Sequence, residues 1–294
     1  MPRAAKVLTG FFIVAVLLVG VALVFTLIQP RPAPPALPKP NGYEVLAQAG
    51  RMLADRTSDY YTMSEAELRT LVKTNAEALK LARSGLSLPC QVPLDYSAGS
   101  LTNWADLPWL KRLAQAMAAE GRLHELEGCP ADAADSYLTA IRVGFATSKG
   151  GLLIDALVGI AIEAIGDTYL EKLSLTLNAK QCRHAAAVLE SCEAGREPAA
   201  TILARERAWS RRAYGLKGQI VRMVTYKSLR QTEQRVVSKV NSIQVREQVL
   251  LVQLASRAYE LEKGERPKGL VDLVPAYLKT IPQDPVTGTN MAYP

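Results

Sequence analysis

The chain has 294 residues, of which 49% are apolar, 21% charged and 6% aromatic, and its formal charge is +7. The apolar fraction is sufficient for a packed core and excludes a chain that is disordered throughout. The low aromatic content argues against a β-rich fold. Because the chain has only two histidines, a histidine-rich metal site is excluded and a histidine-based catalytic triad is not expected.

An apolar segment lies close to the N-terminus. Residues 7–28 are 22 consecutive positions without a charged side chain, and a helix needs roughly 20 apolar residues to span a bilayer. The alternative is a cleaved signal peptide, whose apolar core is about 7–15 residues long and ends at a small-residue site. The segment is longer and runs into Gln29, Pro30 and Arg31. We therefore expect an uncleaved transmembrane helix in a single-pass protein.

The orientation of this helix depends on the charges that flank it. Arg3 and Lys6 precede it, and Arg31 and Lys39 follow it, so the two flanks carry equal numbers of cations. A short N-terminal flank with two cations and no acid usually stays inside. We therefore expect residues 1–6 in the cytoplasm and the rest of the chain outside the bacterial cytoplasmic membrane.

A proline-rich linker, residues 29–41, follows the predicted membrane helix. Six prolines lie between positions 30 and 40, and proline disrupts a helix and favours extended polyproline II. At about 3.1 Å per residue, the linker would reach roughly 40 Å. We interpret it as a stiff spacer, in preference to a ligand for a proline-binding module.

Residues 42–258 show helical periodicity and form the predicted body. Ser64 and Glu67 match a capping box, which predicts a helix from there to about Arg83. Further helices are predicted over 109–128, 152–173, 178–193 and 198–263, the last with a break near Gly215 and Gly218. We expect a mainly α fold: one transmembrane helix, then an extracytoplasmic array of helical hairpins with a short irregular C-terminal cap.

The segment 152–173 is strongly apolar but contains Asp155, Glu163 and Asp167. Its uncharged runs are too short to cross a bilayer, so we predict a central core helix. Glu163 and Asp167 are four residues apart and would share one face. We expect the three acids to lie on a solvated edge of that helix.

Positive charge is concentrated in residues 201–246, which carry eleven Lys and Arg and two Glu. Three interpretations are open: a solvated face docked on the acidic remainder of the protein, which we favour; contact with an anionic membrane surface or a protein partner; and nucleic-acid binding, which an extracytoplasmic location would exclude. The residues predicted to contact an anionic surface are Arg205, Arg207, Arg211, Arg212, Lys217 and Arg222.

The four cysteines form no Cys-x-x-Cys pair, which argues against a zinc ribbon or a redox motif. Outside the cytoplasm an even number of cysteines indicates disulfides. Of the three pairings we prefer Cys90–Cys129 with Cys182–Cys192; the alternative is four buried thiols.

Catalytic motifs are lacking in the sequence. His124 and Glu125 begin like a zincin motif, but Gly128 stands where the second histidine is required. No nucleophile elbow, Walker A or dinucleotide-binding motif occurs. We expect no metal and no cofactor, and the balance is against an enzyme, although hydrolases that use a carboxylate pair have no characteristic spacing.

Residues 114–147 contain Gly121, Ala133, Tyr137 and Ala140, in an order that resembles a single tetratricopeptide repeat. These four residues fall on hallmark positions, where small residues let two antiparallel helices approach and the tyrosine fills the groove between them. No second unit occurs 34 residues to either side, and one unit cannot bury its own faces. We interpret the segment as a helical hairpin.

The tail, residues 259–294, has a distinctive order of residues: Tyr259, Gly264, Pro267, Leu270, Leu273, Tyr277, Leu278, Asp284, Pro285, Gly288 and Tyr293. This order resembles the C-terminal segment of type II secretion pseudopilins and the tails of uncharacterised bacterial membrane-anchored proteins. The N-terminus departs from the pseudopilin pattern, because Ala15 stands where that family has Glu after the cleavage site. We interpret the tail as a structural cap packed on the preceding helix.

These features predict a membrane-anchored extracytoplasmic scaffold or protein-interaction protein. Its expected partners are the lipid bilayer through 7–28, and a protein or an anionic surface through 201–246. One alternative is an envelope-polymer hydrolase whose carboxylates the sequence does not identify. The other is a component of a secretion or pilus-like assembly, which the tail resemblance alone implies.

Overall fold

The computed structural model describes residues 36–54, 60–95, 102–224 and 226–293, with a few positions between 13 and 21; the side chains of 102, 103, 215–229 and 232 are not described. The described residues are mainly helical and contain no β-strand. The predicted mainly α fold class is therefore confirmed.

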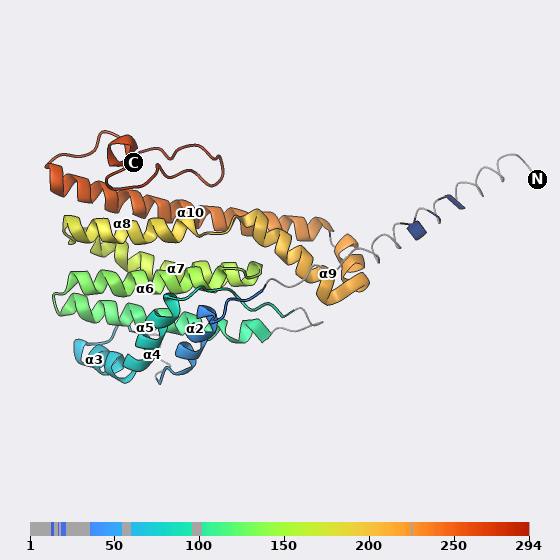
Figure 1. The fold of residues 1–294 in the computed structure, drawn as a ribbon, viewed down its shortest axis with the longest axis horizontal. Helices are drawn as coiled ribbons and strands as arrows, with labels where there is room; N and C mark the ends of the chain where they lie inside the picture. Colours follow the sequence, from blue (N-terminus) through green and yellow to red (C-terminus); the bar gives the residue numbers. More distant parts are fainter. Residues whose placement is uncertain are drawn as a thin grey trace, which may run out of the picture.

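The helices form a stack of neighbouring hairpins (Figure 1). Helices α5, α6 and α7 occupy its centre, with α2, α3 and α4 on one side and α8 and α10 on the other. Their bounds are α2 Gly42–Arg51, α3 Glu65–Thr74, α4 Ala76–Leu86, η1 Thr102–Ala105, α5 Leu107–Leu126, α6 Pro130–Ser148, α7 Leu153–Leu173, α8 Ala179–Ala194, α9 Ala199–Val224, α10 Tyr226–Lys263 and η2 Leu270–Leu273.

Local capping explains where the first helices begin and end. The predicted capping box is present, since the Ser64 hydroxyl accepts from the Glu67 N–H and the Glu67 carboxylate accepts from the Ser64 N–H. The single helix predicted to reach Arg83 is instead divided at Asn75. The Asn75 Oδ1 accepts a hydrogen bond from the Ala54 N–H at 2.9 Å. The residue between α3 and α4 therefore holds the segment that follows α2 in place.

Glycines let the central helices approach closely. A Cβ on Gly166 of α7 would lie 2.5 Å from the Tyr137 carbonyl oxygen of α6, and one on Gly159 would lie 2.7 Å from the Gly144 carbonyl oxygen. On the other side of α6, the Tyr137 ring occupies the space beside Gly121 of α5. The backbones of these helices therefore pack where only a hydrogen atom fits.

Helix α7 confirms the predicted core helix, but its acids do not lie where we expected them. The exposed fraction is 0% for Asp155, 0% for Glu163 and 3% for Asp167. The expected solvated edge is wrong because α6 packs on one side of α7 and α10 on another. The helix therefore buries its acids together with its apolar residues.

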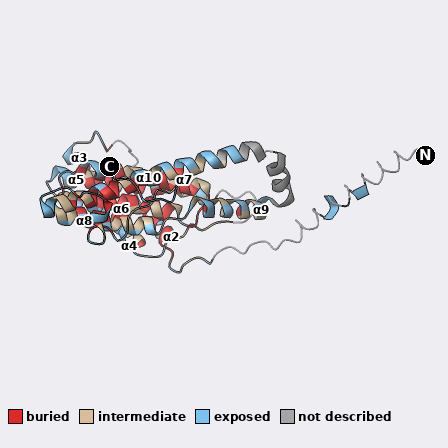
Figure 2. Ribbon diagram, turned by 90° about the horizontal axis from the view of Figure 1, so that it is seen from above, coloured by how far each residue is buried: buried red, intermediate tan, exposed pale blue. Residues whose placement is uncertain are grey.

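The break predicted near Gly215 and Gly218 is also wrong. Helix α9 continues through both glycines to Val224, and α10 begins at Tyr226; a glycine costs only about 1 kcal/mol in a helix interior. Helix α10 has 38 residues, a length of about 57 Å. Its C-terminal half packs on α7 and α8, whereas its N-terminal part and α9 project beyond the stack (Figures 1 and 2).

The tail packs on the stack as the sequence predicts. Helix α10 ends at Lys263, and Gly264 follows it with a positive φ of 77° that suits glycine. Leu273, Tyr277 and Leu278 then join the core formed with α8 and α10, and the Arg183 guanidinium of α8 donates to the Ala276 carbonyl at 2.9 Å. The tail is an integral cap of this end of the molecule.

The predicted cytoplasmic segment 1–6, the predicted transmembrane helix 7–28 and most of the linker 29–41 lie outside the described residues. Within the part of the chain that the structure describes, no helix has both the length and the apolar character needed to cross a membrane. The transmembrane helix therefore stays a prediction from the sequence.

Candidate functional site

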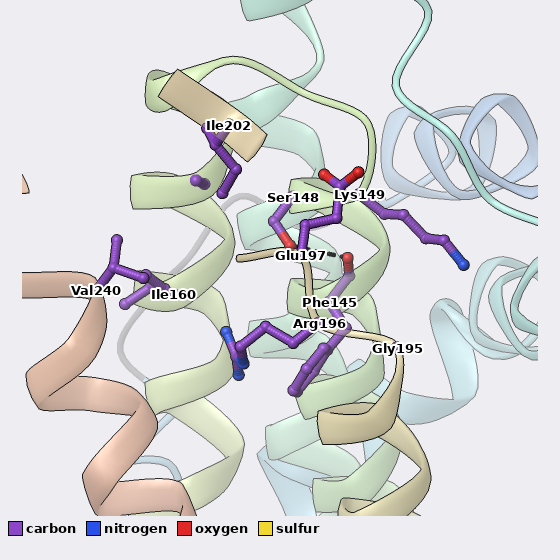
Figure 3. Close-up of a pocket in the computed structure, with 10 residues that line it drawn as sticks. Phe145, Ser148, Lys149, Ile160, Gly195, Arg196, Glu197, Ile202 and Val240 are labelled. Atoms are coloured by element: carbon purple, nitrogen blue, oxygen red, sulfur yellow. Dashed lines mark hydrogen bonds between the residues drawn. The ribbon is translucent and has the colours of Figure 1, made fainter. Parts of the chain in front are cut away.

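A buried arginine lies at the junction of four helices. Arg196 lies two residues after the end of α8, and only 9% of its side chain is exposed. Its guanidinium carbon lies 4.1 Å from the centroid of the Phe145 ring of α6. Figure 3 shows the two side chains together. The aromatic face attracts the cation electrostatically, so Phe145 helps to hold the charge inside the protein.

Three acidic side chains bind this guanidinium. Arg196 Nη2 donates to Glu163 of α7 at 2.8 Å and also to Glu247 of α10, and its Nε donates to Glu193 of α8 at 2.8 Å. Asp167 lies one turn beyond Glu163 on α7. We call Glu163, Asp167, Glu193, Arg196 and Glu247 the Arg196 cluster. It ties α7, α8 and α10 to one another.

The Arg196 cluster holds more carboxyl groups than one cation can balance. One oxygen on each of its four acids is buried without a hydrogen-bond partner among the described residues. Burial, and next the charge of Glu163, raise the pKa of Glu247 far above its ordinary range. The same two causes raise the pKa of Asp167 to about 8. Burial therefore favours the protonated form of both groups, which limits the buried negative charge.

Replacing Asp167 is expected to change the pH dependence of stability. Its folded pKa lies above the ordinary 3.8, so the folded state holds the proton more tightly; the resulting stability is complete below about pH 4 and is lost as the pH rises through about 8. Asp167→Asn cannot ionise. Relative to the wild type, this variant should therefore be more stable at pH 9 than at pH 5, in urea unfolding of the full chain in detergent.

The matched control for this prediction is Asp132→Asn, an exposed acid in the first turn of α6. Its stability relative to the wild type should not show the same rise between pH 5 and pH 9. Equal pH dependence in the Asp167→Asn variant and the wild type would show that Asp167 ionises alike in the folded and unfolded chain.

The pocket beside Arg196 is small. Phe145, Ile160, Ile202 and Val240 line it together with Arg196 (Figure 3). Its cavity volume is about 20 Å³, which suffices for one water molecule. A sugar ring or a peptide cannot enter it, so this pocket gives the cluster no access to a polymer substrate.

A second polar contact fixes the base of α9. Arg205 donates to the Gly151 carbonyl at 2.7 Å and to Glu197 at 2.9 Å, and Glu197 also accepts the Gly150 N–H at 3.1 Å. These bonds attach α9 to the turn between α6 and α7. Arg205, predicted to meet an anionic surface, is thus held by an internal partner.

The other predicted basic residues have mixed surroundings. Arg207 pairs with Glu233 of α10 at 2.8 Å, Arg211 is exposed and Arg212 is half-buried. The side chains of Lys217 and Arg222 lie outside the described residues. The favoured interpretation is a basic segment docked on the acidic remainder of the protein. Arg205 fits that interpretation because it pairs with Glu197, whereas Arg211 is exposed and does not fit it.

The structure does not bring either preferred cysteine pair together, and all four cysteines are free thiols. Cys182 and Cys192 lie ten positions apart on α8, a rise of about 15 Å, whereas a disulfide joins Cα atoms less than about 7 Å apart. Cys129 and Cys90 lie near opposite ends of α6. Cys129 is its N-cap residue, whereas the chain just after Cys90 meets its C-terminal end, where the Val92 N–H donates to the Lys149 carbonyl.

The described residues contain no group of three or more His, Cys, Asp or Glu side chains that could hold a metal ion. Comparison of the chain with protein-family models, with curated proteins and with solved structures found no match. Sequence reasoning singled out Glu163 and Asp167 by their spacing but missed Glu193, Arg196 and Glu247. Glu193 and Arg196 are only three positions apart, but no local pattern links them to Glu247 or to α7, because the fold alone brings these elements together.

Proposed function

We propose that this protein is a single-pass membrane protein whose helical body lies outside the bacterial cytoplasmic membrane and acts as a scaffold that binds other proteins. The apolar segment 7–28 supports the anchor, and the proline-rich linker supports a body held away from the bilayer. The pseudopilin-like tail packs into the body, which favours a structural part for it within this scaffold.

The observation that carries the scaffold proposal is the burial of the acids at the centre of the body. Glu163, Asp167 and Glu247 are at most 3% exposed, and Arg196 neutralises part of their charge. A glycoside hydrolase needs two carboxyl groups that flank its substrate. These three acids cannot reach a polymer, so binding through the surface of the helices is the better supported activity.

The test uses a photo-crosslinking amino acid at Leu126 or Leu175 in the full chain, expressed in bacterial cells. Both leucines are exposed, and both lie near the ends of α5 and α7 that point away from the turn between α6 and α7. We expect discrete crosslinked species that contain an envelope protein.

The matched control is the same substitution in a chain that lacks residues 1–28. This chain would stay in the cytoplasm, so the envelope crosslinks should vanish. Absence of crosslinks at both positions in the full chain, combined with cleavage of an isolated envelope polymer by the purified protein, would overturn the scaffold proposal.

A further inference from the structure

The projecting part of the α9–α10 hairpin is strongly basic. We define the basic arm as residues 207–239, which carry nine Lys and Arg and one Glu. Besides Arg207, four of these cations are described and exposed: Arg211, Arg230, Arg235 and Lys239. The one acid, Glu233, is paired with Arg207 inside the arm. The arm therefore presents an excess of positive charge, since no acid among the described residues of the body forms an ion pair at these four positions.

The basic arm begins at the end of the stack where the linker reaches the body. Asn41 is the last linker residue, and its side-chain amide donates to the Gln91 carbonyl at 2.8 Å. Val92, which follows Gln91, donates its N–H to the carbonyl of Lys149, just after α6. The base of α9 is attached to the same turn after α6, since the Arg205 guanidinium donates to the Gly151 carbonyl. The linker and the arm are thus joined to one end of the stack.

A third contact holds the base of the arm in place. Trp209 is buried against Leu94 and Leu152, and its indole N–H donates to the Asp95 carbonyl at 2.6 Å. Beyond Ala213 of α9 and Val240 of α10, which are both buried, the two helices run on for about 11 to 14 residues. At 1.5 Å per residue these stretches are about 20 Å long. Figure 1 shows α9 and the start of α10 projecting beyond the stack.

These lengths are compatible with contact between the arm and a bilayer. The linker of residues 29–41 reaches roughly 40 Å when extended, which exceeds the length of the arm. A body tethered by this linker can therefore lie with its arm toward the lipid surface without strain. Bilayers rich in acidic phospholipids attract Lys and Arg close to their surface and do so less at high salt.

We propose that the basic arm binds the anionic headgroups of the membrane that holds residues 7–28, which orients the body on the bilayer. This inference rests on the proposed function, because it requires the anchor. The partner is an acidic phospholipid surface. The arm adds a second, electrostatic attachment to the hydrophobic one, so it fixes the tilt of the stack and turns the ends of α5 and α7 away from the bilayer.

The test places a fluorescent amino acid at Ser238, an exposed neutral residue of α10, in the full chain reconstituted into nanodiscs. The lipid is either phosphatidylcholine alone or an equal mixture with phosphatidylglycerol, and a nitroxide on the lipid serves as the quencher. We expect quenching in the mixed lipid, little in phosphatidylcholine alone, and reversal at high salt.

The quadruple variant Arg211→Gln, Arg230→Gln, Arg235→Gln and Lys239→Gln should lower the bound-to-free ratio of the arm by about tenfold or more, because each cation near an anionic surface adds to the attraction. The matched control removes four exposed cations elsewhere, by the substitutions Lys80→Gln, Lys111→Gln, Lys180→Gln and Lys268→Gln. This control should quench like the wild type.

The possible failures differ from one another. A full chain that enters neither nanodisc would contradict the anchor, and the arm proposal would fall with the proposed function. A chain that enters both but shows no added quenching with phosphatidylglycerol would overturn the arm proposal alone. A control variant as weak as the arm variant, or a response to double-stranded DNA in place of anionic lipid, would also overturn it.

Discussion

Replacing Arg196 with methionine is expected to lower the free energy of unfolding by about 3–5 kcal/mol, the usual cost of breaking a buried ion pair from one side. The guanidinium donates to Glu163, Glu193 and Glu247. Without it these carboxyl groups stay buried next to Asp167 with no cation. They lose their hydrogen bonds to the guanidinium and its positive charge, and this loss destabilises the fold.

Urea unfolding of the full chain in detergent, followed by far-ultraviolet circular dichroism, measures this loss. The matched control is Arg266→Met, because Arg266 is 84% exposed and its ion pair with Glu260 is open to solvent; such pairs contribute little. The deficit of Arg196→Met should shrink at acid pH, where the carboxyl groups are protonated. A loss no larger than that of Arg266→Met would contradict the account of the Arg196 cluster.

Replacing Gly166 with alanine is expected to lower the free energy of unfolding by about 1–3 kcal/mol, the cost of overpacking a core. An added methyl group would lie 2.5 Å from the Tyr137 carbonyl oxygen and 2.6 Å from Ile141 Cγ1. The first of these atoms is backbone, so α6 itself must move. This cost opposes the gain of up to about 1 kcal/mol that alanine brings to a helix interior.

The same denaturation experiment tests the packing of α6 on α7. Gly195→Ala is the matched control, because the nearest atom to its added Cβ lies 3.4 Å away, at an ordinary contact distance. We expect Gly195→Ala to keep wild-type stability. If Gly166→Ala were as stable as this control, the two helices would have room that the structure does not show.

Much of the helical body could be predicted because its signals are local. The capping box at Ser64 and Glu67 and the glycine at 264 are set by neighbouring residues, and the structure has both. The buried apolar residues of the tail, such as Leu273, follow from its short pattern of leucines and prolines. In each case the residues that define the element lie within a few positions of one another.

The errors concern contacts between distant elements. The spacing of Glu163 and Asp167 shows that they share a face, but not that α10 covers this face and supplies Glu247. Helix α9 ends at Val224 and not at Gly215, because a glycine lowers helix stability without ending a helix. Cys182 and Cys192 fit a hairpin only if a turn separates them, and α8 runs through both.

The central claim is that the helical body lies on the outer side of the cytoplasmic membrane, with its basic arm turned toward the bilayer. Compartment-specific reporters fused after Pro294 of the full chain test it most directly. The account predicts activity of the reporter that works only outside the cytoplasm and none of its cytoplasmic counterpart. The reverse pattern would contradict the account, because the body and its basic arm would then face the cytoplasm.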